Sequence, residues 1–145
     1  MNEKYQQVLV FFVHVMLPNM KRLGIDYGSK KIGLAVTDDG GNIAFPLEVV
    51  PNDDSFVSHI EQLVADRNID EIVIGHSLDN QGKANIIHEA TEELITNLTL
   101  VIGIPVHLEP EQYSTQEAKQ IQGQSAQTDA SAAAIILNSF IDKQK

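Results

Sequence analysis

Residues 22–36 read RLGIDYGSKKIGLAV, and this stretch indicates how the fold begins. Apolar side chains alternate with other residues along 22–27, which is the period of a β-strand. Residues 28–30 have the composition of a turn, and residues 32–36 continue as a second strand. A further turn signal at residues 38–42, DDGGN, precedes a third strand at 43–50, in which Pro46 indicates a sheet edge or a bulge. Three strands at this short spacing predict an antiparallel meander.

The hydrophobic pattern changes to a helical period after the third strand. The remaining elements are predicted in this order: a helix capped by residues 53–55 and running to about residue 67, a strand at 71–75, a helix at 84–102 that ends before Gly103, a strand at 106–108, a short helix at 114–121 and a last helix at 129–141. Strands joined by helices favour parallel pairing. We therefore expect an α/β fold with a five-stranded mixed sheet, three antiparallel strands followed by parallel crossovers, flanked by helices.

The composition is that of one folded domain. The chain has 145 residues, of which 43% are hydrophobic, and this combination predicts a single packed unit. The absence of cysteine excludes disulfides, thiolate zinc sites and a cysteine nucleophile. No apolar stretch reaches the roughly 18 residues of a transmembrane helix. We therefore expect no contact with a membrane. The composition does not indicate a compartment.

The first 19 residues differ from the rest. Residues 8–17 read VLVFFVHVML, a run of apolar side chains interrupted by His14, and the run is broken at Pro18-Asn19-Met20. We interpret residues 1–19 as an N-terminal extension, either a dispensable tail or the product of a start site assigned upstream of Met20. An extra strand and a secretory signal are the alternatives. Residues 20–145 are then expected to form the domain.

The charge balance is 10 basic against 20 acidic residues, a net charge of −10. Taken alone, this balance argues against nonspecific nucleic-acid binding, since affinity for phosphates needs Lys and Arg. Four of the basic residues nevertheless lie close to Asp26 in the sequence: Lys21, Arg22, Lys30 and Lys31. We treat these four as candidate contacts to backbone phosphates, with a solvated basic surface as the alternative.

Three acidic residues lie at the ends of predicted elements. Asp26 follows a strand that reads as buried, Glu111 lies just beyond the last strand, and Asp129 is in the first turn of the last helix on the side of its apolar stripe. Each also has an ordinary interpretation, as a turn residue, a solvated loop carboxylate and a helix cap respectively. If the three converge, their mutual repulsion calls for a compensating cation. One or two Mg²⁺ or Mn²⁺ ions would suit such oxygen ligands and would support phosphodiester hydrolysis.

Four blocks of the sequence, in this order, resemble the YqgF/RuvX family of the ribonuclease H-like superfamily. The first block is the opening stretch at residues 22–36. The others are residues 71–75 with Leu78 and Gly82, residues 110–118 (PEQYSTQEA), and residues 129–137 (DASAAAIIL). The resemblance covers residues 20–142, nearly the whole chain after the extension. Members of the family are described as Holliday-junction resolvases or as nucleases that process pre-16S rRNA.

The resemblance implies a ribonuclease H-like fold and a nuclease whose catalytic and metal-binding residues are Asp26, Glu111 and Asp129. The implied substrate is nucleic acid, and the cytoplasmic location that we expect goes with this function. It is either the 5′ end of pre-16S rRNA, cut during ribosome biogenesis, or branched DNA in recombination and repair, and the protein would act as a monomer or a homodimer. Glu109 lies two residues from Glu111 and is not selected by the resemblance, so we expect that its loss costs little activity.

The sequence departs from the family pattern at three places. The family's acidic motif reads Asp-Glu-Arg, whereas this chain has Pro110-Glu111-Gln112. Residues 122–128 contain no basic residue where the family usually has one, and Ser77 replaces a proline. These changes remove phosphate contacts, and they motivate the alternative of a noncatalytic RNA-binding factor in ribosome assembly. A kinase-like phosphate loop at residues 26–29 is the other alternative, but that class needs a second lobe.

Overall fold

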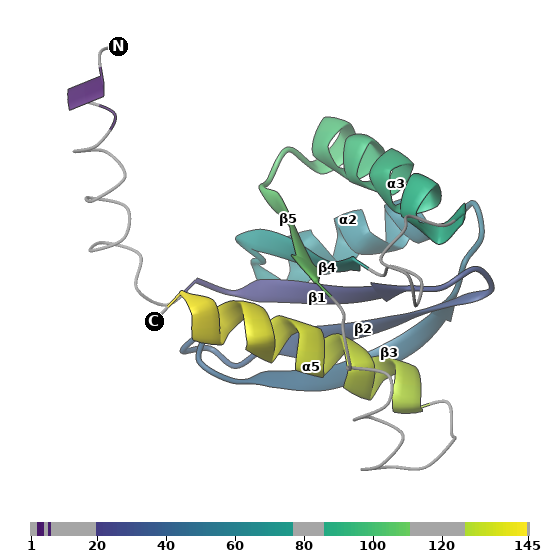
Figure 1. Ribbon diagram of the computed structural model, residues 1–145, viewed down its shortest axis with the longest axis horizontal. Helices are drawn as coiled ribbons and strands as arrows, with labels where there is room; N and C mark the ends of the chain where they lie inside the picture. The colour runs from purple at the N-terminus through teal and green to yellow at the C-terminus, as the bar shows by residue number, and fades with distance from the viewer. Residues whose placement is uncertain (1–2, 5, 7–19, 77–85, 111–126, 145) are drawn as a thin grey trace.

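The computed structural model describes residues 20–76, 86–110 and 127–144, together with residues 3, 4 and 6. In this part of the chain five strands form one sheet, and three helices lie against it (Figure 1). The elements are β1 (Arg22–Tyr27), β2 (Lys31–Thr37), β3 (Ala44–Pro51), α2 (Phe56–Arg67), β4 (Glu71–His76), α3 (Ile86–Ile102), β5 (Val106–Pro110) and α5 (Gln127–Lys143). The short helix expected at 114–121 and the extension at 1–19 lie outside the region just described.

The sheet has the spatial order β3-β2-β1-β4-β5. β1 pairs antiparallel with β2, and β2 pairs antiparallel with β3, which confirms the predicted meander. β4 pairs in parallel with both β1 and β5, as the helical crossovers predict. Pro46 lies on an edge strand and also at a bulge, because Leu34 pairs with Glu48 while the next residue, Ala35, pairs with Pro46.

Two hydrophobic cores lie on the two faces of the sheet. Helices α2 and α3 cover one face and α5 covers the other (Figure 1). The α2/α3 core contains the buried residues Leu23, Ile25, Ile32, Leu34, Phe56, Ile60, Ile69, Ile72, Ile74, Leu94 and Leu98. The α5 core contains Ala35, Ala44, Val73, Ala133, Ala134, Ile136, Leu137, Phe140 and Ile141.

Helix α5 packs unusually close to β1 because both surfaces carry small residues. A Cβ atom added at Gly24 would lie 3.0 Å from the carbonyl oxygen of Ala133 and 3.0 Å from Cβ of Leu137. The buried side chains of Ala133, Ile136, Leu137 and Phe140 confirm the predicted apolar stripe. The helix begins at Gln127, two residues before its predicted start.

The helix ends follow the sequence signals in part. Ser55 precedes α2, but its hydroxyl donates to Asp53 Oδ1 and caps no backbone N–H of the helix. Asn68 ends α2 in the left-handed region, with φ of 56°. Gly103 follows α3 with φ of 80°, and its N–H donates to the carbonyl of Thr99, so this glycine ends the helix as predicted.

Candidate active site

Asp26 lies near the carboxyl end of the central strand β1, on the face covered by α5. Leu23 and Ile25 belong to the α2/α3 core, and side chains alternate along a strand, so Asp26 shares the α5 face with Gly24. Its partner on the neighbouring strand β2 is Gly33. On β4 the residue after Ile74, the partner of Ile25, is Gly75. The half-buried Asp26 therefore lies in the sheet beside two residues that have no side chains.

The first turn of α5 lies at the same edge of the sheet as Asp26. The helix runs antiparallel to β1, since the Phe140 ring lies 5.5 Å from the guanidinium carbon of Arg22 and Ala133 lies against Gly24. From Gly24 to Asp26, two residues along β1, the distance is about 6.6 Å. A step of the same length along α5 takes four to five residues, at a rise of about 1.5 Å each. This step along the helix leads from Ala133 to the backbone of Asp129.

Glu111 lies outside the described residues, but the strand before it reaches the same edge. β1, β4 and β5 are parallel to one another, so their carboxyl ends meet there. Pro110, the last residue of β5, pairs with His76, the last residue of β4. The structure thus brings together Asp26, the start of α5 and the strand end that Glu111 follows.

The three candidate residues would supply carboxylate oxygens, which are the ligands that Mg²⁺ and Mn²⁺ prefer. The described backbone is compatible with such a site, because the residues beside Asp26 on β2 and β4 are the glycines Gly33 and Gly75. No group of three or more His, Asp or Glu side chains within the described residues is arranged to hold a metal ion. The side chains of Glu111 and Asp129 are not among the described ones.

The four predicted phosphate contacts are divided between the two ends of β1. Lys30 and Lys31 lie at the turn between β1 and β2, near Asp26, and both are exposed. Lys31 also shares the α5 face, because its neighbour Ile32 belongs to the opposite core. Arg22 lies at the other end of the strand, about 13 Å from Asp26 at about 3.3 Å per strand residue, and Lys21 is one residue further away.

The basic residues at the far end have partners within the protein. Lys21 Nζ lies 3.5 Å from Asp39 Oδ1, and its backbone N–H donates to Asp70 Oδ2 at 2.9 Å. The Arg22 guanidinium donates from Nε to Glu71 Oε1 and lies over the ring of Phe140. Arg22 is therefore engaged in the packing of α5 on the sheet.

Two buried glutamates anchor α5 and the neighbouring strands, and the sequence did not reveal either role. Glu71 is bound by Arg22 and also by His107, whose Nε2 lies 2.8 Å from Glu71 Oε2. Glu109, with 3% of its surface exposed, accepts a hydrogen bond from Ser139 Oγ at 2.9 Å and pairs with Lys143. Since Glu109 holds the C-terminal half of α5, its replacement is expected to lower stability, and it is not a neutral comparison for Glu111.

None of the helices in the described parts of the chain combines the length and apolar character needed to cross a bilayer.

Comparison with known proteins places the chain in a family. The sequence profile of the RuvX family, described as Holliday junction resolvase, matches residues 20–143. A relative from Dictyoglomus thermophilum, named "Putative pre-16S rRNA nuclease", is 32% identical over 133 residues that cover 85% of this chain and 96% of the relative. A protein of the same name from Oleidesulfovibrio alaskensis is also 32% identical over 133 residues, covering 85% and 92% of the two chains.

Two of the solved structures that match are resolvases in complex with junction DNA, and their low sequence identity supports the fold alone. RuvC of Thermus thermophilus in complex with a Holliday junction substrate superimposes with a TM-score of 0.56 at 18% identity, over 86% of this chain and 96% of RuvC. The resolvase of fowlpox virus bound to junction DNA gives a TM-score of 0.54 at 10% identity, over 86% and 99% of the two chains. With its mixed five-stranded sheet of ribonuclease H-like type, the chain belongs to the RuvX family.

Proposed function

We propose that this protein is a metal-dependent nuclease that hydrolyses phosphodiester bonds, with Asp26, Glu111 and Asp129 as its catalytic and metal-binding residues. The observation that carries the proposal is the position of Asp26. Its carboxylate lies between Gly33 and Gly75 at the edge of the sheet where α5 begins. Membership of the RuvX family supports the assignment of nuclease chemistry to this edge.

The three carboxylates would hold one or two Mg²⁺ or Mn²⁺ ions. Such an ion, when bound, lowers the pKa of a coordinated water and stabilises charge on a phosphodiester oxygen. Ionised carboxylates only accept hydrogen bonds, so they also orient the attacking water. Asp26 is fixed by a central strand paired on both sides, and Asp129 by a helix packed closely on that strand. Lys30 and Lys31 would contact the phosphates that flank the reacting one.

The substrate that we propose is the 5′ end of pre-16S rRNA, cut in the cytoplasm during ribosome biogenesis. The names of the sequence relatives support RNA. A four-way DNA junction is the second candidate, supported by the description of the family. Cutting two strands of a junction requires a symmetric homodimer, whereas a monomer suffices for RNA. A noncatalytic RNA-binding role is the alternative, motivated by the absence of the family's basic residues at Gln112 and in residues 122–128.

A side-by-side cleavage assay tests these proposals. Precursor 16S rRNA and a synthetic four-way junction are incubated with the full-length protein in Mg²⁺, Mn²⁺ or EDTA. We expect cleavage of the RNA at its 5′ end with either ion and none in EDTA. Preferential cutting of the junction would support the resolvase instead, and RNA binding without any cleavage would support the noncatalytic role.

A second measurement tests metal binding without relying on activity. Clustered carboxylates repel one another, so a bound ion should raise the melting temperature through ligand linkage. We expect Mg²⁺ or Mn²⁺ to stabilise the wild-type protein and to lose most of this effect in Asp26→Asn. An equal response in both proteins would place metal binding elsewhere on the surface.

A further inference from the structure

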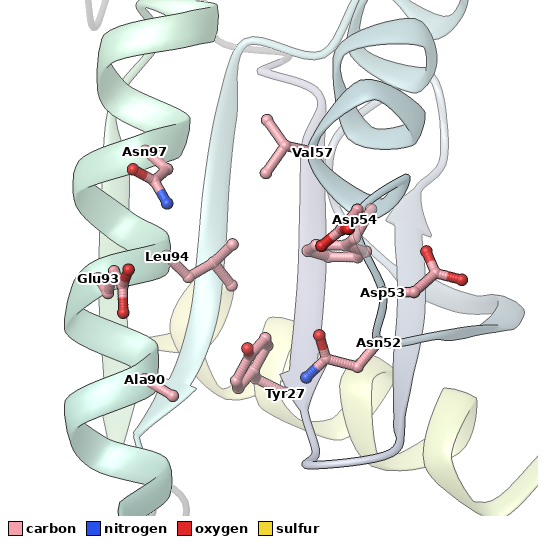
Figure 2. Close-up of a pocket in the computed structure, with 10 residues that line it drawn as sticks. Tyr27, Asn52, Asp53, Asp54, Val57, Ala90, Glu93, Leu94 and Asn97 are labelled. Carbon is pink, nitrogen blue, oxygen red and sulfur yellow. The ribbon is translucent and has the colours of Figure 1, made fainter.

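A cleft of about 300 Å³ opens at the carboxyl end of β1, on the face of the sheet opposite α5 (Figure 2). It lies between the start of α2 and the middle of α3. The side chains that line it come from β1, from the segment before α2, and from both helices. They are Tyr27, Asn52, Asp53, Asp54, Phe56, Val57, Ala90, Glu93, Leu94 and Asn97. The volume is at the lower end of the range, roughly 300–1,000 Å³, of pockets that hold small ligands.

The cleft and the candidate active site are adjacent along the chain. Tyr27 lines the cleft, and Asp26, the residue before it, faces α5. Neighbouring Cα atoms are about 3.8 Å apart, and side chains at consecutive strand positions point to opposite faces. A nucleic-acid strand whose phosphate lies at Asp26 could therefore place a nearby base over the edge of the sheet and into the cleft.

The inner part of the cleft is aromatic and apolar. The rings of Tyr27 and Phe56 lie edge to face, with centroids 6.5 Å apart and planes at 60°. Val57 and Leu94 point into the space between the two helices (Figure 2). Asn52 supports the entrance, because its Nδ2 donates to the carbonyl of Gly28 at 2.8 Å and so ties the segment before α2 to the end of β1. Flat rings stack favourably against such a surface.

The outer part of the cleft is acidic. Asp53 and Asp54 lie on the α2 side, and Glu93 and Asn97 lie four residues apart on α3 and therefore share a helix face. The hydroxyl and the backbone N–H of Ser55 both donate to Asp53, and these hydrogen bonds hold the pKa of Asp53 below its ordinary value. The rim is thus negatively charged at neutral pH.

This lining excludes some ligands and favours others. A phosphate would be repelled by three carboxylates. These carboxylates do not form a metal site either, since no group of three metal-binding side chains occurs within the described residues. A flat, uncharged ring with N–H donors at its edge satisfies both parts of the cleft, because the ring stacks inside while carboxylate and amide oxygens accept its hydrogens.

We propose that the cleft is a nucleobase subsite for the strand being cut, and that it selects bases with an exocyclic amino group: adenine, cytosine or guanine. This inference rests on the proposed nuclease function, because it takes the strand at Asp26 to be a substrate. Amino hydrogens donate to Glu93 and to the Asn97 side-chain oxygen. Uracil has one N–H on this edge, at N3, where an amino group offers two hydrogens, and the carbonyl oxygens on both sides of N3 would face the acceptor oxygens of the cleft.

Equilibrium binding tests the subsite without requiring cleavage. A fluorescently labelled oligouridylate and the same oligonucleotide with one adenine or one cytosine are titrated with full-length protein in EDTA. A hydrogen-bonded contact to a base edge discriminates by about tenfold or more. We therefore expect the oligonucleotide with one amino-bearing base to bind about tenfold more tightly than oligouridylate.

The matched variants are Glu93→Gln in the cleft and Glu61→Gln on the exposed surface of α2. Both remove one negative charge, so their effects on phosphate attraction are comparable. A glutamine amide can rotate to offer either a donor or an acceptor. We therefore expect Glu93→Gln to reduce the preference for the amino-bearing oligonucleotide over oligouridylate to less than about threefold. Glu61→Gln should keep the preference of about tenfold. Three results would overturn the subsite. The wild-type protein could bind the oligonucleotides with equal affinity, the two variants could have equal effects on the discrimination, or neither oligonucleotide could bind.

The subsite and the nuclease activity can fail separately. Base-dependent binding without cleavage in Mg²⁺ or Mn²⁺ would contradict the proposed function and leave the subsite in place. Cleavage with base-independent binding would support the nuclease and contradict the subsite.

Discussion

Arg22 of β1 and Glu71 of β4 form an ion pair beneath helix α5, with 12% and 8% of their side chains exposed. The two residues are partners in the register of the parallel strands. The ring of Phe140 covers the guanidinium, and His107 binds the second carboxylate oxygen. Arg22 therefore joins the sheet to α5, and of the four basic residues Lys30 and Lys31 are nearer to Asp26, at the turn between β1 and β2.

Removing Glu71 should destabilise the fold without altering the chemistry. Glu71→Ala would leave the Arg22 guanidinium buried without its carboxylate, and breaking a buried ion pair in this way costs about 3–5 kcal/mol. The free energy of unfolding in urea measures this loss. Glu48→Ala is the matched control, because Glu48 pairs with His59 where both side chains are 39% exposed, and such pairs contribute about 0–1 kcal/mol. Equal losses in both variants would contradict the structural role of the buried pair.

The close contact between β1 and α5 should be sensitive to one methyl group. In Gly24→Ala the new Cβ would lie 3.0 Å from Ala133 O and from Leu137 Cβ, so α5 must move away. We expect a loss of about 1–3 kcal/mol in the free energy of unfolding, as for overpacked cores, and a lower cleavage rate because the start of α5 shifts relative to Asp26. Gly40→Ala is the comparison, since its Cβ would meet the end of the exposed Asn42 side chain. Unchanged stability of Gly24→Ala would show that α5 is not packed as described.

Lys30 and Lys31 should account for part of the salt dependence of RNA binding. Each phosphate contact adds about 0.7 to the slope of log affinity against log salt concentration for a single strand. Replacing both lysines by alanine should therefore lower the slope by about 1.4. Lys21→Ala removes the same charge at the opposite end of β1, next to Asp39, and should leave the slope nearly unchanged. If Lys21→Ala lowers the slope more than the double replacement does, the nucleic acid binds at the end of β1 opposite Asp26.

A chain beginning at Met20 should fold as well as the full-length protein. Met20 already lies against the β2–β3 turn, since a Cβ at Gly41 would be 2.3 Å from its carbonyl oxygen, and the Lys21 carbonyl accepts the N–H of Asp70 at 2.8 Å. Thermal melting of the two proteins should give the same midpoint within a few degrees. If the shortened chain is unfolded, residues 1–19 belong to the core.

Much of the fold was predictable because strand alternation and turn residues are local signals. Pro46 identified both an edge and a bulge from one residue, and Gly103 marked the end of α3. The start of α5 was placed two residues late, at Asp129, because Gln127 and Thr128 carry no strong helix-start signal. The antiparallel and parallel pairings followed from the lengths of the connections between strands.

The surroundings of the site were less predictable because they depend on residues far apart in the chain. Arg22 and Glu71 are 49 residues apart, and no local pattern indicates that they pair. Nothing near Glu109 in the sequence indicates that α5 brings Ser139 and Lys143 to it. The cleft beside Tyr27 has no sequence motif, since its lining comes from β1 and from two helices.

The central claim is that Asp26, Glu111 and Asp129 act as one metal-binding unit in cleavage. Asp26→Asn, Glu111→Gln and Asp129→Asn are nearly isosteric and remove one negatively charged ligand each. Residues that act as a unit are not additive, so a double variant should be scarcely slower than a single one. Asp39→Asn, at a fully exposed carboxylate of the β2–β3 turn, is the control for loss of charge.

The most direct test is the initial rate of Mn²⁺-dependent cleavage of precursor 16S rRNA by Asp26→Asn, compared with the wild-type protein and Asp39→Asn. Substitutions that only support a metal ligand reduce activity by about 10–100-fold, so loss of a ligand should reduce the rate by about 100-fold or more. We expect that loss in Asp26→Asn, with a melting temperature in EDTA no lower than that of the wild-type protein and a wild-type rate for Asp39→Asn. Equal rates for the wild-type protein and Asp26→Asn would contradict the account.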